Sequence, residues 1–445
     1  MTLDVIRRVK LYQSSYTYRI ILIRRLKKVN SKMRKHKITR RDFLKLAGVT
    51  SAGLALSACG VDATKLPSPI TMSSLAPSPT TNTPTLIPTP KLPTMGELAR
   101  KLGFDIGIAL RIVDDFNNPE YQKFILNFSM LTDGWASNTD RTDNMQNGWG
   151  DRTFTMDYWN MVSAFCKSHN ISLDLNHLYW GDGFFQKDSP DFYLNQASKD
   201  EIDNWYHERI KMFFEIPYFT SANFVNEVLW DNPTNLEFGW NTGLNPLYKI
   251  YGKDYPYESY KVIWNEAVKT GREVGKDIHL IYNTASSETK SPGGSYEFSY
   301  LAGLRDKLNK EFGIERPFDI GLQLHIGTAP IQPGECWRWD SKYYEKESLT
   351  KRFQGLGEIG DIRITEFSIA DTQDAQQQKD ILHTVVESFI DSGVGKSIIM
   401  WGPQEQFDTN LGRINLSCSM RNLMDASYKP MFMFEELYQI LQAKQ

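Results

Sequence analysis

The segment FDIGIAL (104–110) is the first of eight apolar runs that decide the fold of this chain. Between most of the runs lie stretches whose apolar residues recur every three or four positions, as they do on one face of a helix. Near-continuous apolar strands that alternate with amphipathic helices are typical of a parallel sheet covered by helices. Eight such units predict an α/β fold, a single-domain TIM (β/α)8 barrel.

The eight runs cover 104–110, 125–131, 171–178, 222–228, 278–284, 318–326, 361–369 and 396–402, and helical patterns lie at 156–169, 200–215, 260–274, 300–312 and 377–393. A doubly wound open sheet is the alternative architecture for this alternation. The first run is not followed by a Gly-rich phosphate-binding turn, so the sequence favours the barrel and predicts no nucleotide cofactor.

Charge is distributed unequally along the 445 residues. The first 58 residues hold 15 Lys and Arg, with only Asp4 and Asp42 as acids. The rest of the chain therefore has 36 basic and 51 acidic residues, a net charge of about −15, although the charge of the whole chain is −2. An acidic protein of this kind is not expected to bind nucleic acid or an anionic membrane surface through its folded part.

Residues 1–58 have the features of an export signal. The segment TRRDFLK (39–45) has paired arginines followed by a phenylalanine, and a mildly apolar stretch follows from Leu46 to Ala58. This pattern resembles a twin-arginine signal peptide, and the stretch is too short to span a bilayer as a permanent helix. We expect translation to begin at Met33, because that start gives the signal an N-terminal region of ordinary length.

The segment LSAC (56–59) resembles a lipobox, which would make Cys59 the lipidated first residue of the mature protein. From Val61 to about Thr94 the chain is rich in Pro, Ser and Thr and nearly free of charge, so it is expected to form an extended spacer. We therefore predict a signal peptide (1–58), a lipidated cysteine with its linker (59–95) and a barrel domain (96–445). Lipid would hold this domain at the outer face of the membrane, unless the protein is released outside the cell.

Two of the apolar runs end on a glutamate. The segment SANFVNEVLWD (221–231) carries Glu227, and DIRITEFSIAD (361–371) carries Glu366. An isolated carboxylate in an apolar strand is energetically costly. Such a residue is therefore expected either to be paired in a salt bridge or to have a function. The fourth and seventh strands of a barrel can direct both carboxylates into one cleft, which is the arrangement that glycosidases use.

At six places the runs resemble the motifs of glycoside hydrolase family 10, whose best-known members are endo-β-1,4-xylanases. The six segments are FDIGIAL (104–110), AFCKSHNISLDLNHLYW (164–180), FVNEV (224–228), GLQLH (321–325), ITEFSI (364–369) and IIMWG (398–402). They occur in the order of the family's motifs, and six motifs in order are far more specific than any one of them. The resemblance spans about 104–402 and implies the same barrel fold.

The resemblance also implies roles for single residues. Glu227 corresponds to the general acid/base and Glu366 to the nucleophile of a mechanism that retains anomeric configuration. Asn226 corresponds to the residue that binds the sugar 2-hydroxyl, and His325 to the residue that orients the nucleophile. The residues expected to line the sugar site are His177, Gln323, Trp401 and Trp180. This mechanism requires no metal and no cofactor, and we expect a monomer that acts on a polysaccharide.

Three departures from the family pattern concern substrate contacts rather than catalysis. The segment LTDGWASN (131–138) lacks the Glu and Lys that grip the next sugar in the family. Gly181 stands where a second His is usual, and PQEQFDTN (403–410) stands where a second Trp is usual. The resemblance makes xylan the first candidate substrate, and the altered segment 131–138 favours the alternative, another β-glycan such as a glucan or a mixed polymer.

Two readings from other functional classes remain. A surface lipoprotein that binds glycans without cleaving them would keep the fold, although retention of both glutamates argues against it. A solute-binding lipoprotein of a sugar importer would share the lipobox and the linker. It would have two α/β lobes rather than one barrel.

Overall fold

The computed structural model describes residues 92–110, 116–133, 152–179, 198–231, 238–240, 246–284, 296–327, 337–338, 345–369, 375–401, 423–425 and 427–445. All of these lie within one compact unit, Thr89–Gln445. The predicted signal peptide, Cys59 and most of the linker lie outside the described residues. No helix of the described part is long and apolar enough to cross a membrane.

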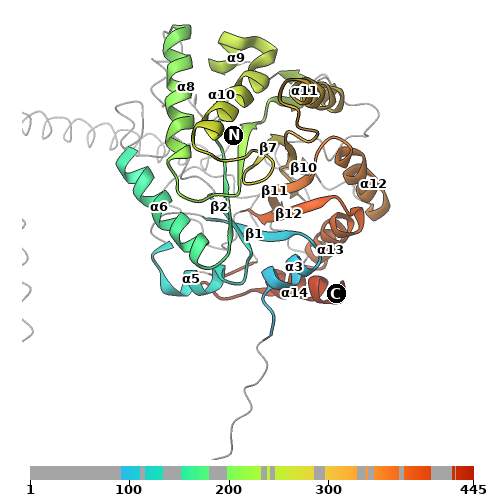
Figure 1. Ribbon diagram of the computed structural model, residues 1–445. Coiled ribbons are helices and arrows are strands. Elements are labelled where there is room, and N and C mark those ends of the chain that lie inside the picture. Colours follow the sequence, from blue (N-terminus) through green and yellow to red (C-terminus); the bar gives the residue numbers. More distant parts are fainter. Residues whose placement is uncertain are drawn as a thin grey trace, which may run out of the picture. The chain divides into compact units, whose positions relative to one another are not determined.

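Eight parallel strands form a closed barrel (Figure 1). They are β1 (Asp105–Leu110), β2 (Met130–Asp133), β3 (Ser172–Leu175), β4 (Ser221–Asn226), β7 (His279–Thr284), β8 (Asp319–Leu322), β11 (Ile362–Ile369) and β12 (Gly395–Met400). Neighbours in the sequence are neighbours in the sheet, and β12 pairs with β1 to close the ring. The predicted TIM (β/α)8 barrel is confirmed, and the two-lobed alternative is excluded for the described part of the chain.

The barrel strands are almost continuously buried, as their apolar sequences predict. Every residue of β4, β8 and β11 is buried. Parallel strands with helices outside and side chains inside have no solvated face, which explains why their sequences do not alternate between polar and apolar residues.

The sixth predicted run is interrupted. After β8 the chain leaves the ladder at Gln323 and Leu324, and β9 (His325–Gly327) then pairs with the end of β11. Three further short strands lie beyond the strand ends: β5 (Leu229–Asp231), β6 (Phe238–Trp240) and β10 (Trp337–Arg338). The interruption places His325 beside the last residues of β11, where the polar groups described below gather.

The second predicted strand, 125–131, is wrong at its start. The chain forms helix α5 (Pro119–Ile125) there, and the strand begins only at Met130. Asn118 caps the helix by accepting a hydrogen bond from the Glu120 N–H, and proline at the first helical position is already constrained to a helical φ. The predicted run therefore begins with the last residue of α5 and the turn after it, which apolar composition alone does not distinguish from a strand.

Helices surround the barrel (Figure 1). They are α3 (Met95–Lys101), α5, α6 (Arg152–Ser168), α8 (Lys199–Phe214), α9 (Pro246–Tyr251), α10 (Tyr255–Lys269), α11 (Tyr296–Phe312), α12 (Lys346–Gly357), α13 (Ala375–Ser392) and α14 (Phe432–Ala443). A single 3-10 turn, Gly252–Asp254, joins α9 to α10. The five predicted helical patterns correspond to α6, α8, α10, α11 and α13.

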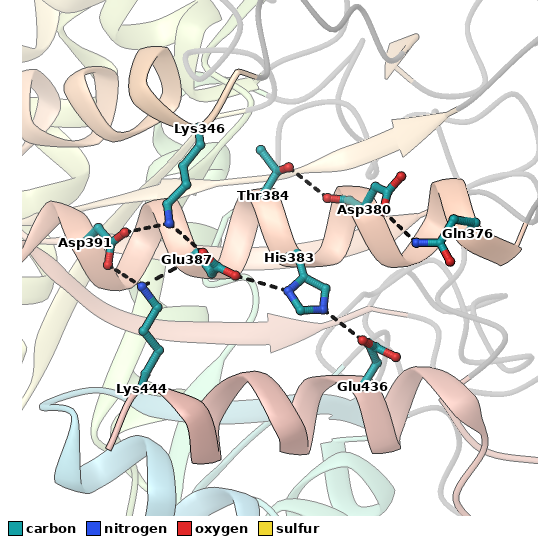
Figure 2. Close-up of polar contacts among 9 residues, drawn as sticks. All are labelled: Lys346, Gln376, Asp380, His383, Thr384, Glu387, Asp391, Glu436 and Lys444. Atoms are coloured by element: carbon teal, nitrogen blue, oxygen red, sulfur yellow. Dashed lines mark hydrogen bonds and ion pairs between the residues drawn. The ribbon is translucent and has the colours of Figure 1, made fainter.

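Ion pairs join the helices α12, α13 and α14 (Figure 2). His383 on α13 lies between two carboxylates, with Nδ1 3.1 Å from Glu387 and Nε2 2.8 Å from Glu436 on α14. Lys346 of α12 also lies 2.5 Å from Glu387. The network holds the C-terminal helix against the barrel wall.

Candidate active site

The candidate site is built from polar side chains at the carboxyl ends of the strands. Glu366 lies on β11 and is only 5% exposed. Each oxygen of its carboxylate has an imidazole nearby, because His177 Nε2 lies 3.4 Å from Oε1 and His325 Nε2 lies 3.4 Å from Oε2. Asn283 Nδ2, on β7, donates to Oε1 at 3.0 Å. A buried carboxylate with three donors is stabilised as an anion.

The ionisation of Glu366 is set by a balance of two effects. Burial by itself raises the pKa of the carboxyl, because the charged form loses its hydration. Hydrogen bonds from His177 and His325 oppose burial and outweigh it, so the pKa falls from 4.5 to about 2. Glu366 is therefore a carboxylate at any pH at which the protein is expected to work.

Asn226, at the end of β4, is held by two neighbouring amides. Its Oδ1 accepts hydrogen bonds from Asn283 Nδ2 at 2.7 Å and from Gln323 Nε2 at 2.9 Å. Two donors at one atom identify that atom as the amide oxygen, which fixes the orientation of the side chain. The Nδ2 group is buried and has no hydrogen-bond partner among the described residues. The Nδ2 group of Asn226 is thus an oriented hydrogen-bond donor in the same cluster as Glu366.

Glu227 directly follows β4 and is half-buried. Its φ of 51° lies in the left-handed region, which is uncommon for a residue with a side chain. The backbone N–H of Glu227 donates to the Asn283 carbonyl oxygen at 2.9 Å. Strained backbone of this kind costs about 1 kcal/mol or more and tends to persist at functional sites.

Other predicted site residues are distributed as follows. His177 follows β3, Gln323 follows β8 and His325 begins β9, so each lies at a strand end. Trp401 follows β12, and its backbone N–H donates to the Phe367 carbonyl oxygen at 2.8 Å. Trp180 lies outside the described residues, as do Gly181 and the segment 403–410.

Asn283 is the residue that the sequence reasoning missed. It connects Glu366, Asn226 and the backbone of Glu227, and its Oδ1 accepts a hydrogen bond from Thr365 Oγ1 at 2.5 Å. The signal was present, because IHLIYNT (278–284) is an apolar run that ends in a polar residue, just as the runs carrying the two glutamates do.

Gly321 makes room for Asn283. A Cβ at this position on β8 would lie 2.5 Å from Asn283 Oδ1 and 2.7 Å from Ile281 Cγ2. Real Cβ atoms do not approach other atoms so closely. The glycine is therefore needed because of the close approach of neighbouring side chains and not for its backbone freedom.

Arg209 on α8 supports the loop that carries His177. This arginine is buried, its Nε donates to the Leu178 carbonyl oxygen at 2.7 Å, and its Nη2 donates to the His177 carbonyl oxygen at 3.2 Å. A buried guanidinium that satisfies two main-chain carbonyls fixes the path of a loop. Sequence alone gave no sign of this role.

The sequence profile of glycosyl hydrolase family 10 matches residues 94–437, which is most of the chain. The chain belongs to glycosyl hydrolase family 10. Membership in this family supports glycosidase activity for the chain. A profile for the signal sequence of the twin-arginine translocation pathway matches residues 37–57 and supports export by that route. A sequence search of curated proteins finds no match for this family 10 chain.

Solved structures of similar fold include several xylanases. Native xylanase 10B from Thermotoga maritima is 18% identical, covers 79% of this chain and 98% of its own, and has a TM-score of 0.59. Xylanase 10B from Thermotoga petrophila RKU-1, solved with xylobiose, is 18% identical, with coverage of 80% and 99% and a TM-score of 0.60. The Penicillium canescens endo-1,4-beta-xylanase XylE is 15% identical, with coverage of 79% and 98% and a TM-score of 0.60. At such identities the likeness establishes the barrel fold of this family 10 chain.

Proposed function

We propose that this protein is a retaining endo-β-1,4-glycanase that hydrolyses xylan or a related β-glycan. In this proposal Glu366 is the nucleophile and Glu227 is the general acid/base. The observation that carries the proposal is the state of Glu366, a buried carboxylate whose pKa is lowered to about 2. A carboxylate that stays ionised in a buried cleft can attack an anomeric carbon directly.

The reaction follows from the two carboxyl groups. Glu366 attacks the anomeric carbon while Glu227 gives a proton to the leaving glycosidic oxygen, and a covalent glycosyl-enzyme forms. Glu227 then takes a proton from water, which displaces Glu366 and releases the sugar with its original configuration. Two displacements at one carbon account for retention.

Asn226 is proposed to bind the 2-hydroxyl of the sugar attached to Glu366. Its buried Nδ2 lacks a hydrogen-bond partner among the described residues, while its Oδ1 is fully occupied. A buried donor without a partner costs about 1–3 kcal/mol, which a substrate hydroxyl would recover. Hydrogen bonds to this hydroxyl strengthen in the transition state of glycoside hydrolysis.

The sugar ring itself is proposed to contact four further residues. His177 and Gln323 lie at strand ends around Glu366 and Asn226, and Trp401 ends β12. Trp180 is included only because of its position in the family motif. Flat aromatic rings suit the C–H faces of sugars. We expect the protein to act as a monomer.

A second substrate is favoured by one sequence feature. The segment LTDGWASN (131–138) lacks the Glu and Lys with which the family grips the next sugar. A β-glucan, or a polymer with mixed linkages, would then be cleaved by the same two glutamates. Only the contacts beyond the cleaved sugar would differ.

Lipid anchoring at Cys59 completes the proposal. The match to the twin-arginine signal, residues 37–57, ends within LSAC (56–59), and a Pro-rich spacer follows. Fractionation of cells that express the protein tests the anchor. Wild-type protein should sediment with membranes, and Cys59→Ala should be released from them, whereas equal distribution of the two would contradict lipidation.

Hydrolysis is tested by release of reducing sugars from xylan, mixed-linkage β-glucan and carboxymethylcellulose. We expect activity on one polymer, loss of that activity in Glu366→Ala and Glu227→Ala, and retention in Glu311→Ala, which changes an exposed glutamate of α11. Proton NMR of the first product should show the β-anomer. Binding without hydrolysis of any polymer would favour the glycan-binding lipoprotein instead.

A further inference from the structure

A buried serine lies behind one of the two imidazoles that contact Glu366. Ser368 follows Glu366 by two residues on β11, is fully buried, and has its Oγ 2.8 Å from His325 Nδ1. The other ring nitrogen, Nε2, lies 3.4 Å from Glu366 Oε2. The imidazole therefore connects a hydroxyl to the proposed nucleophile.

The positions of the protons on Ser368 and His325 follow from the hydrogen bonds that each group can donate and accept. The Ser368 hydroxyl has one O–H to donate, and a buried O–H without an acceptor is costly. Among the described residues its side chain has one hydrogen-bond partner, His325 Nδ1. Nδ1 must therefore be the acceptor and carry a lone pair. The ring proton then sits on Nε2, where it can be donated to Glu366.

Both other protonation states fail this requirement. An Nδ1–H tautomer would donate to Ser368 and turn the Nε2 lone pair toward the Glu366 carboxylate, where two acceptors would face each other. An imidazolium would satisfy Glu366, but it would also donate from Nδ1 and leave the buried Ser368 O–H without an acceptor. The neutral Nε2–H form alone pairs every group.

We propose that Ser368 is a positioning residue that keeps His325 in the neutral Nε2–H tautomer, so that Glu366 receives a hydrogen bond without a full positive charge beside it. This inference rests on the proposed function of Glu366 as nucleophile. A neutral Nε2–H donor fixes the orientation of the carboxylate that attacks the sugar.

The tautomer is measured directly by two-dimensional nitrogen-15 NMR of the histidine rings at pH 7, with His325→Gln used to assign the signals. Protonated and unprotonated ring nitrogens have well-separated shifts, and the imidazolium has a third pattern. We expect an unprotonated Nδ1 and a protonated Nε2. An Nδ1–H tautomer, or an imidazolium at pH 7, would overturn the proposal. This readout does not depend on whether the protein hydrolyses any glycan.

Kinetics of three variants test the consequence. Ser368→Ala should lower kcat about tenfold or more, with KM changed less than about twofold, because the wrong tautomer becomes available. Ser368→Thr keeps the hydroxyl and should restore most of kcat. Ser388→Ala removes an equally buried hydroxyl on α13, which donates to the Lys346 carbonyl oxygen, and should leave both constants unchanged.

The outcomes separate the two proposals. Unchanged kcat in Ser368→Ala, or an equal loss in Ser388→Ala, would refute the positioning role. A wild-type protein that hydrolyses no glycan would refute the proposed function, while the NMR measurement would still decide the tautomer.

Discussion

The main-chain carbonyl of Asn283 accepts a hydrogen bond from the Glu227 N–H at 2.9 Å, while the side chain of the same residue donates to Glu366 at 3.0 Å. One residue of β7 therefore touches both proposed catalytic glutamates. It also donates to Asn226. The geometry of the site depends on this strand, although no role had been expected for it.

Substitution of Asn283 by Ala should lower kcat by about 10²- to 10³-fold, because one polar group that supports the reacting carboxylate is lost and Asn226 loses a donor. The Glu227 backbone contact would remain. Steady-state kinetics on the preferred polymer provide the measurement. Asn127→Ala, at a half-buried asparagine outside the site that donates to the Phe124 carbonyl oxygen, is the control. Equal activity in the two variants would contradict the role of Asn283.

Gly321→Ala should reduce activity and stability together, because the new Cβ would meet Asn283 Oδ1 at 2.5 Å. We expect a loss of about 1–3 kcal/mol in the free energy of unfolding, as for other overpacked sites. Gly303→Ala on α11 is a matched control, since nothing lies within 4 Å of its Cβ and alanine favours a helix by about 1 kcal/mol. Urea unfolding should therefore shift in opposite directions for the two variants. A shift in the same direction would contradict this packing argument.

His177→Gln should move the acid limb of kcat/KM to higher pH. The hydrogen bond from His177 helps to hold the pKa of Glu366 near 2, and its weakening should let burial raise that pKa. A pH profile from 3 to 7 for wild type and variant makes the comparison. Lys101→Gln, at an exposed lysine of α3, should leave the acid limb in place. Identical acid limbs in wild type and His177→Gln would contradict the assignment.

Ionisation of Glu366 should also contribute to stability. Its folded-state pKa lies below the unfolded value of 4.5, so the contribution is complete above 4.5 and is lost as pH falls from 4.5 toward 2. Unfolding by urea at pH 6 and pH 3.5 should show a smaller pH-dependent loss in Glu366→Gln than in wild type. An equal loss in both would contradict the low pKa.

His383 should stabilise the C-terminal helix in the opposite pH direction. Its pKa is raised, because burial, which lowers it, is outweighed by hydrogen bonds to Glu436 and Glu387. The stabilisation is therefore full below the unfolded value of 6.5 and is lost as pH rises through the raised folded value. The ring is 40% exposed, so the effect should be less than about 1 kcal/mol.

Comparison of His383→Gln with wild type by urea unfolding at pH 5.5 and pH 9 tests this contribution. The variant should be less stable at pH 5.5 and nearly equal at pH 9. The charged groups around the ring that must be kept constant are Lys346, Lys379, Glu387, Asp391, Glu436 and Lys444. Lys101→Gln, at an exposed lysine of α3, is the control. A larger difference at pH 9 would contradict the sign.

The sequence predicted those features that follow from runs of apolar residues and from the residues at their ends. Apolar runs predicted the barrel, and the two runs ending at Glu227 and Glu366 predicted which strands carry acids. The start of β2 was missed because apolar composition over residues 125–129 does not distinguish the end of a helix and the turn after it from a strand. Asn283 and Ser368 were missed for another reason. Their importance lies in hydrogen bonds to residues 43 to 83 positions away, and periodicity does not encode such contacts.

The proposed mechanism requires a covalent bond between Glu366 and the sugar. It is tested most directly by incubating the protein with a 2-deoxy-2-fluoro β-xylobioside that has an activated leaving group, followed by mass spectrometry of peptides. We expect the mass of one fluorinated disaccharide on the peptide that contains Glu366, and no label in Glu366→Ala. A label on another residue, or hydrolysis with inverted configuration and no label, would contradict it.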